Sequence, residues 1–320
     1  MVRYEYYKPG TIPEAIGLMG RFNNEAAYIA GGTDVMVLLR QKKLMPKALI
    51  SLRNIKELAA FDGYIIGACV THSQIERDDR IKKRLSALHD AVCNLGSVQI
   101  RNVATIGGNV CNAAPSADTA CPLLVLDAES LIVGPGAERR VAMDDFFVGP
   151  GRTVLAKGEI LKGFMMPAFG EATGSAYIKH TRRNAMDLPI IGIAARVTVN
   201  KSDLRCKDIL CGTAPASEIL AHFGDEELRC EDLRIAMGVV APRPIRAKKA
   251  EAMLAGKVIS AETVAACAET AASEASPRDS VRGEAWYRRE MVKVLVQRAI
   301  MKAIDRIVRP DAEVYPDRLW

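Results

Sequence analysis

Short apolar stretches alternate with amphipathic stretches along the first part of the chain, a pattern typical of α/β architecture. Thr11 and Glu14 have the spacing of a capping box, and Pro13 follows the cap directly, so a helix is expected from there to about Gly20. A second helix is expected from about Asp34 to Gln41. The strands expected around these helices are Tyr4–Tyr7, Ala27–Ala30 and Ala48–Leu52.

The middle of the chain changes from regular patterns to a segment rich in small residues. Tyr64–Thr71 alternates as a strand does, and Gln74–Leu95 has a helical pattern. Gln99–Leu126 is dense in Gly, Asn, Ala and Pro, which predicts a loop whose backbone is closely approached rather than a packed element. Short strands are expected from Leu131 to Pro167.

A boundary is expected near Phe169–Gly174, where small and polar residues gather. The last helix has the clearest pattern, and its apolar stripe predicts core packing in a second domain. The stripe consists of Tyr287, Met291, Val294, Leu295, Ile304 and Ile307. The elements expected after the boundary are strands at Ala176–His180, Ile190–Asn200 and Asp232–Val240 and helices at Arg246–Ala255, Ala261–Ala275 and Glu284–Val308.

Composition and charge exclude several classes of protein. The net charge of +6 is spread along 320 residues in short runs without interleaved aromatics, which argues against nucleic-acid binding. Neither a signal peptide nor an apolar segment of membrane-spanning length is apparent. The eight cysteines form no C-x-x-C pair, which favours a reducing, cytoplasmic location and argues against an iron–sulfur cluster held by this chain alone. The four histidines lack metal-ligand spacing, so no metal site is expected.

The first candidate binding segment is Ala30-Gly31-Gly32-Thr33-Asp34, between an expected strand and an expected helix. A turn without Cβ atoms lets backbone N–H groups face an anion, and Thr33 adds a hydroxyl donor. The carboxylate of Asp34 opposes a bare phosphate, but it could cap the helix or bind a ribose hydroxyl. The alternative is a plain glycine turn.

The second candidate is Thr105-Ile106-Gly107-Gly108-Asn109, which continues through Asn112 to Asp118. Backbone amides could neutralise phosphates here, while Asn and Asp could bind hydroxyl groups. A tight loop whose polar side chains satisfy their own turns is the alternative. Neither segment is a G-x-G-x-x-G or Walker sequence, so the pair predicts a diphosphate held between two subdomains rather than a Rossmann site.

At these two loops the chain resembles the FAD-binding proteins of the molybdenum hydroxylase family, which includes xanthine dehydrogenase and carbon monoxide dehydrogenase. The resemblance extends in order over nearly the whole chain. The segments that carry it are Ala30–Asp34, Gln99–Asn109, Pro115–Ala120, Tyr177–Lys179, Val239–Ala247, Val281–Gly283 and Tyr287–Met291.

The resemblance implies an α+β fold. Residues 1–172 would form an FAD-binding domain of two α/β subdomains, about 1–57 and 58–172. Residues 173–308 would form a C-terminal domain of sheet and helices, and 309–320 a tail. The span Asp203–Glu231 is longer than the family's usual strand connection and leaves the register there open.

The resemblance also implies which residues bind FAD. Two segments would wrap the diphosphate, namely Ile29-Ala30-Gly31-Gly32-Thr33-Asp34-Val35 and Thr105-Ile106-Gly107-Gly108-Asn109. Asn112 and Asp118 would hold the sugar–phosphate chain, and Leu161 and Lys179 would lie near the isoalloxazine ring. Lys179 could stabilise negative charge on reduced flavin, or it could be a surface strand residue.

In function, the resemblance implies an oxidoreductase subunit in which the flavin performs the redox chemistry and no side chain is catalytic. Electrons would pass from a [2Fe–2S] small subunit through FAD to NAD or another acceptor, after substrate oxidation on a molybdopterin-containing large subunit. Two alternatives stay open. One is a self-sufficient flavin oxidoreductase, and the other is a flavin-free scaffold subunit.

Overall fold

The computed structural model describes residues 4–200 and 228–308, which form two compact units. The first unit comprises Met1–Arg77, Gly96–Ala114 and Asp127–Pro167, and the second comprises Asp78–Leu95, Pro115–Leu126 and Ala168–Trp320. Residues 78–95 and 115–126 thus precede the expected boundary in sequence but pack in the second unit.

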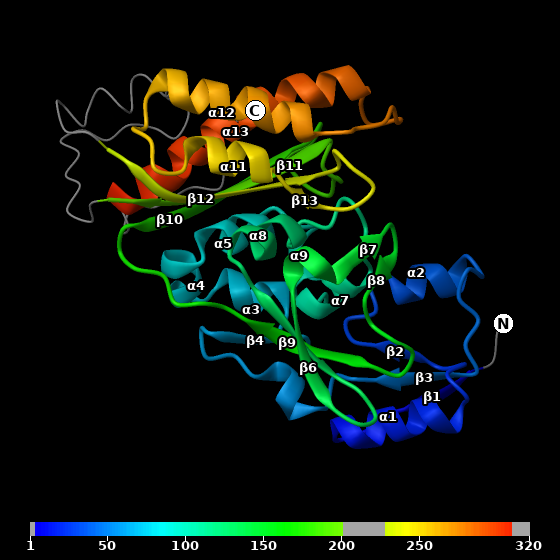
Figure 1. The fold of residues 1–320 in the computed structure, drawn as a ribbon. Helices are drawn as coiled ribbons and strands as arrows, with labels where there is room; N and C mark the ends of the chain where they lie inside the picture. Colours follow the sequence, from blue (N-terminus) through cyan, green and yellow to red (C-terminus); the bar gives the residue numbers. More distant parts are fainter. Residues whose placement is uncertain (1–3, 201–227, 309–320) are drawn as a thin grey trace. The chain divides into compact units, whose positions relative to one another are not determined.

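The first unit begins with a three-stranded parallel sheet in the order β1-β3-β2, made of Glu5–Tyr7, Ala48–Ser51 and Ala27–Ile29 (Figure 1). Helix α1 (Ile12–Arg21) packs on it through Ile12, Ala15 and Met19, which share a core with Ile50. Thr11 Oγ1 accepts from Glu14 N at 3.3 Å, as the capping signal predicts.

A four-stranded antiparallel sheet, in the order β4-β9-β5-β6, completes the first unit together with a short hairpin. Strand β4 is shorter than the Tyr64–Thr71 strand expected, because Gly67 approaches Leu58 O and the chain turns there, with Val70 N donating to Gly67 O at 3.0 Å. The elements are β4 (Ile65–Gly67), β9 (Ile160–Met165), β5 (Glu129–Val133), β6 (Glu138–Ala142), hairpin strands β7 (Phe147–Gly149) and β8 (Arg152–Thr153), 3₁₀ helix η1 (Lys56–Ala59) and α9 (Met143–Phe146).

The expectation of an unpacked loop over Gln99–Leu126 is wrong, because three short helices form there. They are α6 (Val98–Arg101), α7 (Ile106–Cys111) and α8 (Ala120–Val125). Ser97 and Thr105 cap the first two through their hydroxyl oxygens, and all residues of α8 are buried. Small residues at these positions permit close packing, which composition alone does not distinguish from a loop.

The helical stretch expected at Gln74–Leu95 is divided into three helices. They are α3 (His72–Glu76), α4 (Asp79–Arg84) and α5 (Ser86–Cys93). Thr71 forms a full capping box with Gln74, and Asp78 caps α4, so these two caps start new helices. Helix α5 begins after Leu85 without a side-chain capping bond.

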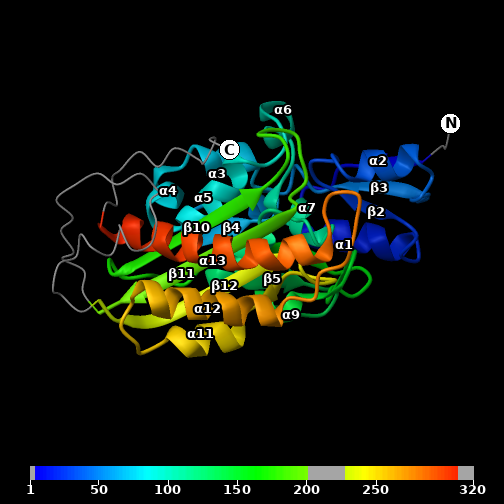
Figure 2. The ribbon, with the colours of Figure 1, turned by 90° about the horizontal axis from the view of Figure 1, so that it is seen from above.

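The second unit is built on a four-stranded antiparallel sheet in the order β10-β11-β12-β13. Helices α11, α12 and α13 cover one face of the sheet, and α5 and α8 cover the other, as Figures 1 and 2 show. The new elements are β10 (Thr173–His180), β11 (Ile191–Val199), β12 (Cys230–Gly238), β13 (Ile245–Arg246), α11 (Lys248–Leu254), α12 (Ala261–Glu274) and α13 (Ala285–Val308).

The apolar stripe of α13 packs largely as expected. Leu295, Ile304 and Ile307 lie in the core with Ile193. Val294, which is 39% exposed, and Tyr287, which is partly exposed, lie outside this core.

Some segments assigned from the sequence lie outside the residues that the structure describes. Residues 203–227 of the long span Asp203–Glu231 are among them, and they include Cys206 and Cys211. The tail 309–320 also lies outside the described residues. No helix of the described ranges is long and apolar enough to cross a membrane.

Candidate functional site

The first glycine segment forms a turn at the carboxyl end of β2, before helix α2 (Val35–Arg40). A Cβ atom on Gly31 would lie 2.2 Å from the carbonyl oxygen of Val103, and Gly32 has a φ of +78°. Neither position accepts a side chain without rearrangement. The turn therefore lies against the residues that precede the second glycine segment, within the same unit.

The backbone amides of this turn have no partner of their own. In the described part of the chain, none of the N–H groups from Gly31 to Asp34 donates a hydrogen bond. Asp34 begins α2 but makes no side-chain capping bond. A run of unpaired N–H donors in a glycine turn is the arrangement that binds a phosphate group.

The second glycine segment differs from the first, because its amides are already used. Ile106 N donates to Val70 O at 3.0 Å, Gly107 N to Ala68 O at 2.9 Å, and Gly108 N to Thr105 Oγ1 at 3.1 Å. A Cβ on Gly107 would lie 2.5 Å from the Cβ of Ala68. The second glycine segment therefore packs α7 against residues 68–70, which follow β4. Of the two segments, the first is the one whose backbone N–H groups are unpaired and able to bind a ligand.

The other residues expected near the cofactor in this unit are Asn112 and Leu161. Asn112 is exposed at the end of α7, and its backbone N–H donates to Gly108 O. Leu161 lies in β9 and is buried.

Sequence reasoning missed His72 in this unit, a fully buried residue at the start of α3. Neither ring nitrogen has a hydrogen-bond partner in the described residues. Burial, with a smaller contribution from the charge of Arg101, lowers the pKa of His72 to about 4. Its imidazole is therefore neutral at physiological pH.

The second unit brings together two residues that were expected to contact the cofactor separately. Lys179 Nζ lies 2.9 Å from Asp118 Oδ2 and also 2.9 Å from the carbonyl oxygen of Asn94. Tyr177 donates its hydroxyl to Asp118 Oδ1 at 3.3 Å. Lys179 is thus a buried, paired residue rather than a surface strand residue.

The pKa of Asp118 is shifted by its buried position. Burial raises its pKa to about 6, against the opposing charge and hydrogen bond of Lys179. We expect carboxyl NMR to show ionisation of Asp118 near pH 6, and at a higher pH in Lys179→Met, which removes the cation that favours the carboxylate. An apparent pKa near 4 in both proteins would contradict this arrangement.

A second buried ion pair, also missed from the sequence, joins α5 to α13. Arg306 donates to both oxygens of Asp90 at 2.8 and 2.6 Å, and to Ser175 O at 2.6 Å. Asp90 also accepts from Tyr177 N at 2.9 Å. Since Tyr177 lies in β10 and bonds to Asp118 as well, this pair also supports the Lys179–Asp118 region.

The free amides of a glycine turn, together with the absence of a G-x-G-x-x-G sequence, are features expected of a nucleotide-binding protein outside the Rossmann class. Residues 2–169 match the family of the FAD binding domain in molybdopterin dehydrogenase, and residues 176–303 match the CO dehydrogenase flavoprotein C-terminal domain. The chain belongs to the family of FAD-binding subunits of molybdopterin-dependent dehydrogenases.

Individual relatives support this family assignment. The chain is 32% identical over 305 residues to the xanthine dehydrogenase FAD-binding subunit of Escherichia coli O157:H7, covering 93% of this chain and 95% of the relative. It is 28% identical to the carbon monoxide dehydrogenase medium chain of Hydrogenophaga pseudoflava, covering 94% and 97%.

Solved structures give the same result. A chain of carbon monoxide dehydrogenase from Hydrogenophaga pseudoflava superimposes with a TM-score of 0.82 at 30% identity, covering 95% of this chain and 98% of that one. These matches confirm the expected family, the α+β fold class, FAD as the cofactor and the role as an oxidoreductase component.

Proposed function

We propose that this chain is the electron-transfer subunit of a molybdenum hydroxylase. The observation that carries the proposal is the run of unpaired backbone amides from Gly31 to Asp34, which suits the diphosphate of FAD. When bound, FAD supplies the redox chemistry, in which electrons from a [2Fe–2S] subunit are passed to NAD or another acceptor.

The chain's own residues bind and orient the cofactor in this proposal. The amides of the first glycine turn and the hydroxyl of Thr33 donate hydrogen bonds to the diphosphate, with Asn109 of the second segment beside it, and Asn112 binds the sugar–phosphate chain. Asp118, Leu161 and Lys179 stay predicted cofactor contacts. Because Lys179 is paired with Asp118, its positive charge is balanced above the pKa of Asp118 and unbalanced below it.

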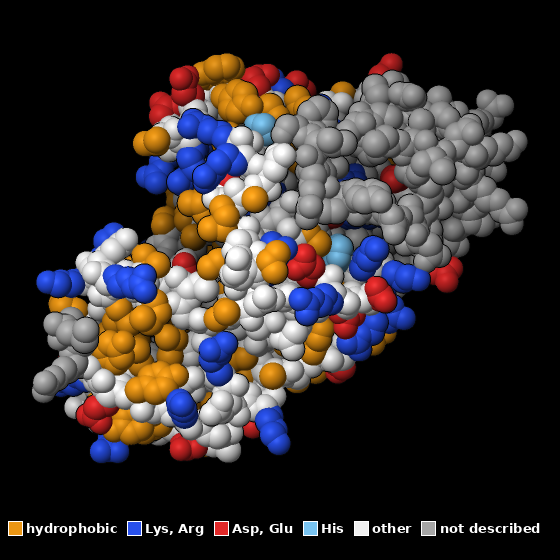
Figure 3. All heavy atoms as spheres, turned by 180° about the vertical axis from the view of Figure 1, so that it is seen from behind, with side chains coloured by type: hydrophobic (Ala, Val, Ile, Leu, Met, Phe, Trp, Pro, Cys, Tyr) orange, Lys and Arg blue, Asp and Glu red, His pale blue; other side chains and the backbone are white. Residues whose placement is uncertain are grey.

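The proposed partners are a molybdopterin-containing large subunit and the [2Fe–2S] small subunit, in the cytoplasm. One relative is by name the medium chain of an enzyme, which supports an assembly of several chains. Helix α2 has no buried residue although it is mostly apolar. Apolar side chains gather at the lower left of Figure 3, and the exposed apolar residues of the first unit include Tyr6, Met36, Val37 and Met45. Such a surface fits contact with a partner subunit.

The test of FAD binding uses Thr33 rather than Gly107, since a side chain at Gly107 would collide with Ala68 and disturb the fold. We expect Thr33→Val, which keeps the shape and removes the hydroxyl, to bind FAD roughly tenfold or more weakly. A hydrogen bond to a charged group contributes about 1.5–3 kcal/mol. The measurement is titration of the apoprotein with FAD, followed by flavin absorbance.

The matched control is Thr270→Val in α12, which makes the same chemical change within the second unit. Its FAD affinity should equal that of the natural chain. An unchanged affinity in Thr33→Val would remove Thr33 from the site, and a chain that takes up no FAD at all would favour the scaffold alternative.

Electron transfer is tested on the FAD-loaded chain with co-expressed partner subunits. We expect flavin bleaching by substrate only when the iron–sulfur and molybdenum subunits are present. Substrate turnover by the isolated chain would instead support the self-sufficient oxidoreductase.

A further inference from the structure

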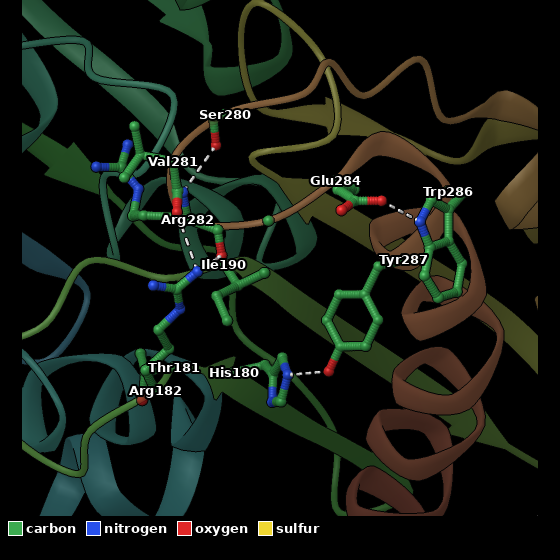
Figure 4. A pocket seen from close by; sticks show the side chains of 11 residues that line it. His180, Thr181, Arg182, Ile190, Ser280, Val281, Arg282, Glu284, Trp286 and Tyr287 are labelled. Carbon is green, nitrogen blue, oxygen red and sulfur yellow. Dashed lines mark hydrogen bonds between the residues drawn. The ribbon is translucent and has the colours of Figure 1, made fainter.

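The second unit contains a pocket at the start of α13, whose lining includes His180 but neither Lys179 nor Asp118. Its volume is about 510 Å³, within the usual range for small-molecule sites of roughly 300–1,000 Å³. The end of β10, the segment 280–284 and the first turn of α13 form its walls (Figure 4). The residues that line it are His180, Thr181, Arg182, Ile190, Ser280, Val281, Arg282, Gly283, Glu284, Trp286 and Tyr287.

Two arginines hold the wall of this pocket in place. Arg182 Nη2 donates to Val281 O at 3.0 Å and to Arg282 O at 3.1 Å. Arg288, which is only 1% exposed, donates to Ile190 O, Arg278 O and Ser280 Oγ, which are all uncharged. Arg288 is therefore a buried positive charge that contacts the lining residues Ile190 and Ser280 and is not neutralised by its direct partners, whereas Arg182 is exposed.

Arg282 is the lining cation whose side chain can bind a ligand. Its side chain has no hydrogen-bond or ion-pair partner among the described residues, although its backbone N–H donates to Ser280 Oγ. Glu284 is the carboxylate of the lining, and it accepts from the Trp286 indole. With Arg182 beside Arg282, the lining carries more positive than negative charge.

An aromatic wall faces this charge across the pocket (Figure 4). Trp286 is 62% exposed, and its ring packs edge-on against Tyr287 with centroids 5.9 Å apart. The Tyr287 hydroxyl is fixed by His180 Nε2 at 2.9 Å. A broad indole face is thus held in position and left open to a planar ligand.

We propose that this pocket binds a nucleoside diphosphate, with the phosphates at Arg282 and the base stacked on Trp286. Guanidinium groups bind phosphate oxygens through paired, charge-assisted hydrogen bonds, and aromatic faces stack on nucleobases. The two kinds of contact lie on opposite sides of the pocket, as the two ends of such a ligand require (Figure 4). This site goes beyond the proposed electron-transfer function and does not depend on it.

The test titrates ADP into the FAD-loaded full chain and follows tryptophan fluorescence. The chain has two tryptophans, so Trp320→Phe leaves Trp286 as the reporter. We expect saturable quenching, and a dissociation constant at least tenfold higher in Arg282→Gln. Adenosine, which lacks the phosphates, should bind weakly to both.

The matched control is Arg278→Gln, which removes the same charge from an exposed residue outside the lining. It should change the dissociation constant less than twofold. Equal weakening in both variants would show general charge attraction and overturn the site. Release of FAD by ADP would assign the binding to the flavin's own site, and no saturable signal at millimolar ADP would also overturn the proposal.

Discussion

Asp90→Ala lowers the free energy of unfolding by about 3–5 kcal/mol, the usual loss when one partner of a buried ion pair is removed. Asp90 is 2% exposed and binds both Nη atoms of Arg306. Lys302 Nζ lies 3.7 Å from the same carboxylate. The variant would leave two buried cations without their common anion, and Tyr177 N without its acceptor.

The pH dependence of this contribution follows from the same contacts. Burial alone would raise the pKa of Asp90, but Arg306 and Lys302 hold it below its usual value. A carboxyl group with a lowered pKa stabilises the folded state above its unfolded pKa, and the contribution is lost as pH falls through the folded pKa. The full effect of Asp90→Ala is therefore expected at neutral pH.

Urea unfolding of the full chain measures this loss, followed by far-UV circular dichroism. Glu269→Gln is the control, since its ion pair with Lys293 is exposed and should contribute less than about 1 kcal/mol. In the double variant with Arg306→Met, the combined loss should be smaller than the sum of the single losses. A loss below about 1 kcal/mol in Asp90→Ala would show that the pair does not stabilise the unit.

Elements marked by signals within a few residues could be predicted from the sequence. The Thr11–Glu14 cap places the start of α1, and Gly31-Gly32 places the turn between β2 and α2. Each signal acts through hydrogen bonds or backbone angles of its immediate neighbours. The strands of the second unit were also expected, although β11 is buried along nearly its whole length rather than on alternate residues, because helices cover both faces of its sheet.

The different roles of similar glycines could not be predicted in this way. Gly31 and Gly107 both begin a Gly-Gly pair in the sequence, yet the amide of Gly31 is unpaired and that of Gly107 bonds to Ala68 O. The difference depends on which backbone lies opposite each turn. That information comes from residues distant in the sequence, which local composition does not contain.

The buried charges were unpredictable for a related reason. Asp118 and Lys179 were each assigned to the cofactor, but the structure places them 2.9 Å apart. Asp90 and Arg306 are 216 positions apart in the sequence and carry no motif. A single charged residue in an amphipathic segment indicates a solvent-exposed face until its partner is known.

His72→Leu is expected to raise stability, and to do so increasingly as the pH falls. At neutral pH the histidine buries two polar nitrogens without partners, and each buried unsatisfied group costs about 1–3 kcal/mol. The folded-state pKa of His72 is about 4, lowered by burial and by Arg101, against an unfolded value of about 6.5. Between about pH 6.5 and pH 4, the imidazole of His72 therefore binds a proton in the unfolded chain but stays neutral in the folded chain.

This difference in proton binding lowers the free energy of unfolding of the natural chain as the pH falls from about 6.5 to 4. The loss reaches about 3 kcal/mol at pH 4. Leucine at position 72 removes that part of the pH dependence. The measurement is urea unfolding of both proteins from pH 7.5 to 4, with the difference between the two curves plotted against pH. Taking the difference cancels the contributions of Asp90 and Asp118, which both proteins share.

The control is Ile75→Leu, at a buried residue of α3 that carries no titratable group, so its difference curve should stay flat. A flat curve for His72→Leu as well would show that the imidazole is protonated or hydrogen-bonded in the folded chain. A gap that widens toward low pH would instead show a neutral histidine buried beside the second glycine segment, since His72 N donates to Ala104 O at 3.1 Å. In that case acid would destabilise the first unit where α3 and α7 meet. The affinity of the natural chain for FAD should then fall below pH 6, while the affinity of His72→Leu should stay unchanged.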